Sequence, residues 1–176
     1  MTNKFLLVFS SLLLLLSCGT DDTTDYPIIP EITFEEYTLN RELRSGIPVD
    51  VFELTIGYLD GDGDIGMKNN EKTLPGSDDI KHVLFIDYLE EDKNGNFKKV
   101  VCKLGEDTTT KKYRVPYITP VGNNKSIKGI ITTKVLPCPL PRDTVRALKF
   151  DIYIIDRQLH KSNVVSSPVI YYESIQ

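Results

Sequence analysis

The sequence predicts an all-β protein, an immunoglobulin-like or fibronectin-III-like β-sandwich of about seven to nine strands. Three observations predict this class. Apolar residues beyond residue 30 alternate with a period of two, turn residues separate the short apolar runs, and no stretch shows the period of an amphipathic helix. Short strands joined by frequent turns are typical of sandwiches and barrels.

Eight segments are expected to be strands, because each alternates apolar and polar residues between turn residues. The segment 49–58 places its bulky side chains on one face, and these are Phe52, Leu54, Ile56 and Tyr58. That face is therefore expected to pack into the core. The eight segments are residues 31–39, 49–58, 81–91, 97–104, 112–118, 126–135, 145–155 and 164–172.

The segment 81–91 carries apolar side chains on both faces, which indicates a strand in the middle of a sheet. It is followed by Asn94 and Gly95. An Asn-Gly pair predicts a tight hairpin, because both turn positions then take positive φ. The segment 97–104 is expected to be the second strand of that hairpin.

Residues 1–17 are predicted to be a lipoprotein signal peptide. Lys4 precedes an apolar run over residues 5–16, which is too short to cross a hydrocarbon core about 30 Å thick as a helix. The run ends in Leu-Leu-Ser-Cys, which resembles the lipobox of bacterial lipoproteins. The chain is therefore predicted to be cleaved directly before Cys18, and Cys18 to be lipidated. Several acyl chains together give stable anchoring. An ordinary secretory signal is the alternative.

Residues 18–30 are predicted to form the lipidated cysteine and a flexible tether, and residues 31–176 one sandwich domain. The acidic stretch after Cys18 resembles the surface-export signal of Bacteroidota-type lipoproteins. We therefore expect a lipid-anchored protein of the outer membrane, exposed at the cell surface; a plain spacer is the alternative. The net charge is −4 and no basic run exceeds two residues, so the sequence lacks the footprint of nucleic-acid binding.

Cys102 and Cys138 remain once Cys18 is assigned to the lipid anchor. In an exported protein such a pair is expected either to form a disulfide or to stay as two thiols, and the spacing favours neither. A disulfide would stabilise the fold by about 3–4 kcal/mol in the chain-entropy model. A zinc site is not expected, because there is no CxxC motif and the two histidines lie far apart in sequence.

Asp60, Asp62 and Asp64 alternate with glycine and predict a calcium-binding loop after the segment 49–58. Calcium takes about six to eight oxygen ligands, and aspartates at alternate positions of a tight turn can aim several carboxylates at one point. Three negative charges this close together are unfavourable without a cation. The alternative is an acidic turn whose carboxylates stay hydrated.

The loop also imitates an EF-hand, since counting from Asp60 places Glu71 at the twelfth position. Two departures exclude an EF-hand. The sixth position is Ile65 rather than glycine, and the preceding segment is a strand rather than a helix. Ile65 is expected to turn inward as a hydrophobic plug. Asp156, from another loop at the same end of the sandwich, is a candidate remote ligand.

The segment after the seventh expected strand combines acid, base and hydroxyl side chains. Asp156, His160 and Ser162 lie on one short hairpin, and no nucleophile elbow or oxyanion loop accompanies them. Asp156 and Arg157 are expected to pair or to cap the turn, and Asn163 to serve its tight geometry. The chain is therefore not expected to be an enzyme.

Two motifs carry a resemblance to a known family, IGYLDGDGDIG at residues 56–66 and DIYIIDRQLHKSNVVSSPVI at residues 151–170. Behind a lipobox, they resemble short Bacteroidota-type surface lipoproteins with an Ig-like domain, in which a strand runs into a DGDGDIG loop. The resemblance implies fold and location, and it implies no activity.

Two functions from different classes agree with these features. The first is a non-catalytic, lipid-anchored surface module that binds a protein or a glycan, with calcium stiffening one loop. The second is an accessory or structural subunit of an outer-membrane complex, with no ligand of its own. The identity of neighbouring genes would separate them, because transporter and glycanase genes point to nutrient capture.

Overall fold

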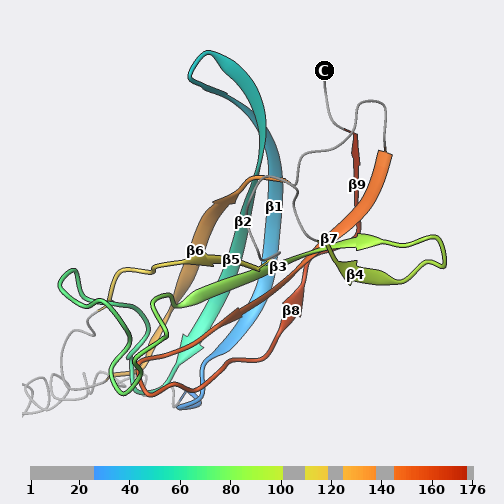
Figure 1. Ribbon diagram of the computed structural model, residues 1–176. Coiled ribbons are helices and arrows are strands. Elements are labelled where there is room, and N and C mark those ends of the chain that lie inside the picture. Colours follow the sequence, from blue (N-terminus) through green and yellow to red (C-terminus); the bar gives the residue numbers. More distant parts are fainter. Residues whose placement is uncertain (1–25, 101–109, 119–124, 138–144, 174–176) are drawn as a thin grey trace, which may run out of the picture.

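The computed structural model describes residues 26–100, 110–118, 125–137 and 145–173, which form nine strands and no helix (Figure 1). In these ranges there is accordingly no helix that could cross a membrane. The predicted lipidation site Cys18 and the disulfide candidates Cys102 and Cys138 lie outside the described residues. The predicted all-β fold is confirmed.

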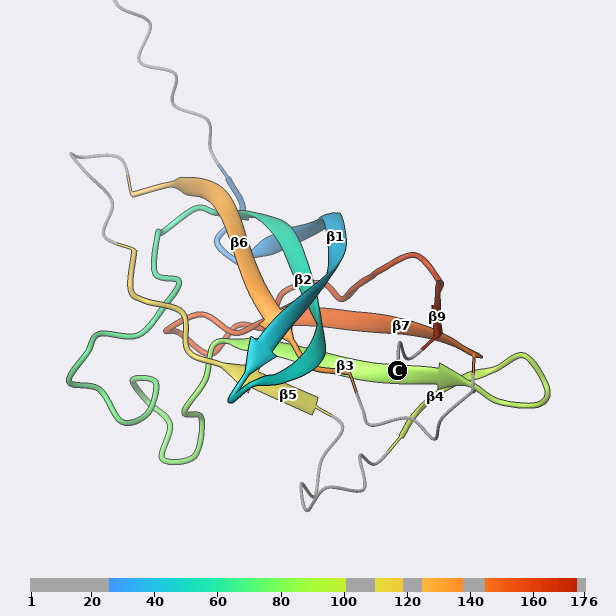
Figure 2. The ribbon, with the colours of Figure 1, turned by 90° about the horizontal axis from the view of Figure 1, so that it is seen from above.

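The strands form two antiparallel sheets that pack on each other as a sandwich. The smaller sheet has the order β1-β2-β6, and the larger has the order β4-β3-β7-β8, with β5 also beside β3 and β9 beside β7. Figure 2 shows the two layers from above. The strands are β1 Glu31–Arg44, β2 Ile47–Asp60, β3 Leu84–Glu91, β4 Phe97–Lys99, β5 Thr110–Tyr113, β6 Ile127–Val135, β7 Val145–Ile154, β8 Val165–Ser166 and β9 Ile170–Glu173.

The centre of the core is an aromatic cluster contributed by both sheets. The ring of Phe150 from β7 lies edge-on to Phe52 of β2, with centroids 5.3 Å apart, and edge-on to Tyr88 of β3, at 5.7 Å. Edge-to-face pairs at this distance are favourable beyond the area that they bury. The predicted core face of β2 is confirmed, because all four of its bulky alternates are buried. The predicted central strand is confirmed as β3, which is paired on both sides.

The hairpin between β3 and β4 forms where Asn94 and Gly95 predict it, with a different turn. Only Gly95 takes a positive φ, of 80°, whereas an Asn-Gly turn of the expected type needs two such residues. The side chain of Asp92 explains the difference, since its Oδ1 accepts the N–H groups of Asn94 at 2.8 Å and Asn96 at 3.0 Å. The carboxylate thus satisfies backbone donors that the tighter turn would pair differently.

The first two strands are longer than expected. The predicted gap over residues 40–48 is instead the end of a long hairpin, which turns at Ser45 and Gly46 with φ of 51° and 81°. We call residues 41–49 the arm, and it projects beyond the other strands (Figure 1). Leu43 and Ile47 on the arm are 74 % and 65 % exposed. Charged residues interrupt the apolar alternation here, so the sequence pattern does not predict a strand over these residues.

The last predicted strand, 164–172, is divided into β8 and β9. Pro168 lies between them and has no N–H to donate to a ladder. The hydroxyl of Ser167 replaces part of the missing pairing, because its oxygen accepts the N–H of Phe150 at 3.0 Å. The interruption therefore follows from proline chemistry and leaves no unpaired donor at Phe150.

Asn163 does not serve the tight turn that the sequence predicts. Its Oδ1 accepts the N–H of Ile32 at 2.8 Å, and its Nδ2 donates to the carbonyl of Ile32, also at 2.8 Å. One side-chain amide thus imitates a strand partner for the beginning of β1. This pair of bonds ties the segment after β7 in one sheet to β1 in the other.

Candidate metal centre

The strand β2 ends at Asp60, which is fully buried, with 0 % of its surface exposed. The chain then curls through Gly63 and Gly66, whose φ values of 65° and 107° favour glycine. At Gly66 there is also no room, since a Cβ would lie 2.4 Å from the carbonyl oxygen of Pro116. The glycines of the motif are therefore required by the path of the backbone.

The loop is held in place on three sides. Ile65 is fully buried in the core, which confirms the expected plug. The N–H of Gly61 donates to the carbonyl of Pro27 at 2.8 Å, and the hydroxyl of Ser126 donates to the carbonyl of Gly61 at 3.1 Å. The acidic loop thus contacts both the segment that precedes β1 and the segment that precedes β6.

The three aspartates converge. One carboxylate oxygen from each of Asp60, Asp62 and Asp64 lies within 4.8 Å of the others. The Oδ1 atoms of all three are buried and accept no hydrogen bond from the described residues. Buried carboxylate oxygens without a partner carry a large desolvation cost, so they are rarely left in this state. The three carboxylates could hold a metal ion.

The electrostatics of the cluster agree with the need for a cation. Burial, together with the charges of Asp62 and Asp64, raises the pKa of Asp60 from 3.8 to about 7. Burial and the charges of Asp156 and Asp62 raise the pKa of Asp64 to about 6. The carboxylates therefore resist ionisation together at neutral pH, and a bound cation would reverse that tendency.

Asp156 lies near the cluster and is not one of the three converging residues. Its charge reaches Asp64, which places both loops at the same end of the sandwich, as expected. However, its two oxygens accept the N–H of His160 at 2.7 Å and pair with the Nδ1 of His160 at 2.9 Å. Asp156 is therefore a cap for its own turn, which is one of the three roles that the sequence predicts for it, beside pairing with Arg157 and acting as a remote metal ligand.

Glu71, the twelfth position of the imitated EF-hand, points its carboxylate elsewhere. Its two oxygens accept from the guanidinium of Arg157 at 2.6 Å each, and one also accepts the N–H of Lys68 at 2.8 Å. This bidentate pair lowers the pKa of Glu71 to about 2. Arg157 thus pairs with Glu71 rather than with Asp156, and the rejection of an EF-hand agrees with this geometry.

Two residues complete the surroundings of the cluster: Arg157, which the sequence predicts only to pair with Asp156 or to cap its turn, and Gln158, for which the sequence predicts no role. The side-chain amide of Gln158 donates to Asp62, and the nearby backbone of Arg157 offsets part of the rise in the pKa of Asp64. Both residues come directly after Asp156. A loop that brings Asp156 to this end of the sandwich also brings its two neighbours there, so the position of Asp156 is the sequence signal for both.

The residues considered for a triad make other contacts. The hydroxyl of Ser162 donates to the carbonyl of Asn163 at 2.7 Å and accepts the N–H of Ile154 at 3.0 Å. It acts as a local substitute for strand pairing at the end of β7. The pairing of Asp156 with His160 is a link within one turn, of the kind that caps structure.

No protein family, curated protein or solved structure matches this chain.

Proposed function

We propose that this chain is a non-catalytic, lipid-anchored module of the outer membrane that binds a protein or glycan at the cell surface. In this proposal Asp60, Asp62 and Asp64 hold one calcium ion that stiffens one end of the sandwich. The observation that carries the proposal is the convergence of three buried Oδ1 atoms without partners. A polar atom in that position needs a cation or a donor.

The donor set favours calcium over other metals. All three side-chain ligands are carboxylate oxygens, whereas zinc is bound mainly through cysteine and histidine. Magnesium demands near-ideal octahedral geometry and keeps several waters, while calcium accepts irregular sets of carboxylates, carbonyls and water. A curled loop with alternating aspartates supplies an irregular set of oxygen ligands, as calcium accepts.

The effect of the ion would be to join two loops. Asp62 already contacts Gln158, and Asp64 contacts the backbone of Arg157. A cation removes the repulsion among the aspartates and lets both loops stay close without protonating them. The result is a rigid end of the domain next to the tether, since Gly61 is bonded to Pro27.

The arrangement of the arm supports an outward-facing role. β1 has 14 residues, so at about 3.3 Å per residue its ends lie roughly 45 Å apart. The tether enters at Glu31, and the arm is at the other end. If Cys18 is anchored in lipid, the arm is presented away from the membrane. Its exposed Leu43 and Ile47 also suit the alternative, docking as an accessory subunit, because burying exposed apolar side chains against a partner is favourable.

A calorimetric titration of the purified protein with calcium, magnesium and zinc tests the metal site. We expect calcium to bind most tightly and to raise the melting temperature, and chelator to lower it again. Absence of heat with calcium, together with no change in melting temperature on adding chelator, would contradict the calcium site.

Two further experiments test location and class. Cys18→Ala is expected to move the protein from the membrane fraction to the soluble fraction, and protease added to intact cells is expected to cleave the wild type. A pull-down separates the two functions, because a stoichiometric membrane partner indicates the accessory subunit and a hit on a glycan array indicates the binding module.

A further inference from the structure

A second site lies beside the acidic loop and has the opposite charge. An open cavity of about 650 Å³ is lined by the segment that follows the loop and by the segment that follows β5. Its base is fixed by backbone pairing, because Met67 donates to the carbonyl of Val115 at 2.8 Å and Tyr117 donates to the carbonyl of Met67 at 3.0 Å. The base is lined by the exposed Pro116 and by Met67 and Val115, which are largely buried beneath it.

Three cations line the rim, and they are Lys72, Lys81 and Arg114. Within the described ranges, no carboxylate forms an ion pair with Lys72 or Lys81. Arg114 uses one terminal nitrogen for the carbonyls of Lys68, at 3.2 Å, and Glu71, at 2.9 Å. Its guanidinium is thereby oriented while keeping its charge. We call this cavity the basic pocket.

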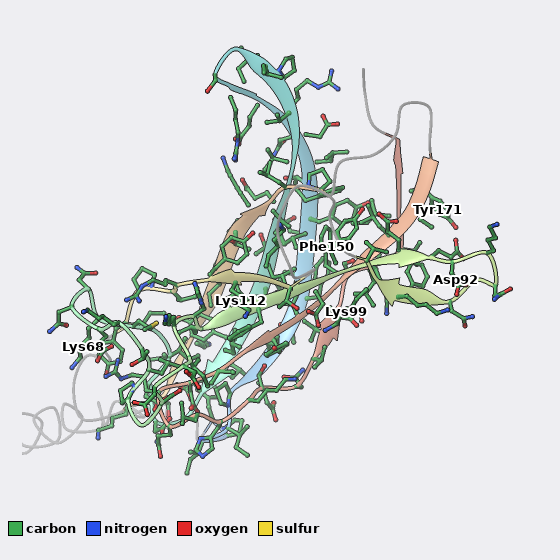
Figure 3. All side chains as sticks on the ribbon, in the orientation of Figure 1. Lys68, Asp92, Lys99, Lys112, Phe150 and Tyr171 are labelled. Carbon is green, nitrogen blue, oxygen red and sulfur yellow. The ribbon has the colours of Figure 1, made fainter. Side chains whose placement is uncertain are left out.

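The acid in the basic pocket does not offset these charges. Glu71 is the carboxylate that lines it, and both of its oxygens are already paired with Arg157 at 2.6 Å. Burial lowers the pKa of the neighbouring His82, and the charges of Lys112, Arg114 and Lys81 lower it further. Lys112 and Lys68 are labelled in Figure 3, on β5 and on the loop after β2.

The basic pocket differs in the sign of its charge from the molecule as a whole. The chain has a formal net charge of −4, so a general attraction for anions is not expected. Like charges that face one cavity repel each other unless a counter-charge lies between them. Lysine and arginine around an apolar base are the means by which proteins hold an oxyanion attached to a larger body.

We propose that the basic pocket binds an oxyanion, a carboxylate, sulfate or phosphate group, carried by a sugar-sized ligand that rests on the exposed Pro116 at its base. Lys72 and Lys81 would supply point charges, and Arg114 would supply directed donors. This inference rests on the proposed binding function and names the ligand class. It does not depend on the calcium ion, because none of the three aspartates lines the pocket.

A matched series of small sugars tests the proposal. Glucuronate, glucose 6-sulfate, glucose 6-phosphate and neutral glucose are titrated into the isotope-labelled protein, and backbone amide shifts are followed. We expect at least one anionic sugar to bind with Kd of about 1 mM or tighter, with shifts at Lys72, Lys81 and Arg114, and glucose not to bind. Which of the three binds identifies the source of the oxyanion. Raising the salt to about 0.5 M is expected to weaken binding by screening.

The variant Lys72→Ala with Lys81→Ala is expected to weaken binding at least about tenfold, because each lysine contributes a charge-assisted contact. Both side chains are exposed, so the fold is preserved. The matched control is Lys93→Ala with Lys128→Ala, two exposed lysines outside the pocket, which should change the affinity less than about twofold.

The proposal is overturned if every anionic sugar binds with a Kd weaker than about 1 mM, if glucose binds equally well, or if the pocket variant binds like the control. The calcium titration is a separate measurement on the same protein. A negative sugar titration beside a positive calcium titration therefore rejects the oxyanion pocket and leaves the metal site intact.

Discussion

Replacing Asp60 with asparagine is expected to stabilise the cation-free protein and to remove its response to calcium. The ionised carboxylate is fully buried, and its pKa is raised from 3.8 to about 7. This difference corresponds to about 4 kcal/mol of cost for the ionised form, at about 1.4 kcal/mol per tenfold change in proton affinity. Asparagine avoids the charge and keeps an oxygen that can accept the N–H of Asp64, now at 2.8 Å.

The sign of the pH dependence follows from the same shift. A carboxyl whose pKa is higher in the folded state binds its proton more tightly there than in the unfolded chain. The cation-free wild type should therefore lose stability as the pH rises from 3.8 to about 7, the window that the raised pKa of Asp60 defines. Asp60→Asn should lack most of this loss, and saturating calcium should oppose it in the wild type.

Thermal melting in chelator and in excess calcium, at a pH of about 8, measures the effect. Because the loop can relax, we expect about half of the full cost, or about 2 kcal/mol, which for a domain of this size raises the melting temperature by about 4–8 °C. Calcium at about 100 times its Kd should add about 2.7 kcal/mol to the wild type and little to the variant. Asp78→Asn, an exposed aspartate outside the cluster, is the matched control and should change neither value.

One result would refute this reasoning. If Asp60→Asn melts below the wild type in chelator, and calcium changes the melting temperature of neither protein, the buried oxygens of the cluster do not form a cation site. The carboxylate of Asp60 would then be stabilised within the fold itself.

Three other predictions follow from single contacts. Glu71→Gln is expected to lower the melting temperature at neutral pH. The difference from the wild type should shrink as the pH falls from 4.5 toward about 2, because the lowered pKa of Glu71 keeps its ion pair with Arg157 formed above that range. Melting curves over this pH range check the prediction, and a constant difference would contradict it. Asn163→Ala removes both hydrogen bonds to Ile32. It should lower the free energy of unfolding in urea by about 1–3 kcal/mol and speed hydrogen exchange at the Ile32 amide. Unchanged exchange at that amide would argue against these hydrogen bonds. Phe150→Ala should lower the free energy of unfolding by about 3–5 kcal/mol, since it removes the ring at the middle of the aromatic cluster. Tyr171→Ala is the control, because that side chain is 78 % exposed, and it should change the free energy of unfolding little in the same urea assay.

Much of the fold could be predicted because apolar and polar side chains alternate along its strands. The core face of β2 and the two buried faces of β3 follow from side chains that point to opposite sides of a strand at successive residues. The arm could not be predicted in this way. Its residues alternate poorly, and it is held as a hairpin by pairing between β1 and β2 and by contacts such as Arg41 with Asp50 at 3.2 Å.

The candidate site also has a part that the sequence predicts and a part that it does not. Asp60, Asp62 and Asp64 are close in sequence, so their convergence needs only a curled loop with glycine at the positive φ positions. The pairing of Glu71 with Arg157 joins residues that are 86 positions apart. Such a contact depends on which ends of which strands meet, and that is decided when the two sheets pack.

The sequence by itself determined the strand-forming segments, the all-β class and the acidic loop, because side-chain alternation and turn chemistry act over a few residues. Only the tertiary structure decided that Asp156 caps its own turn, that Asn163 binds β1 and that three cations gather in the basic pocket. These outcomes bring together distant segments whose approach is set by the burial of one shared core, and no short-range pattern records that approach.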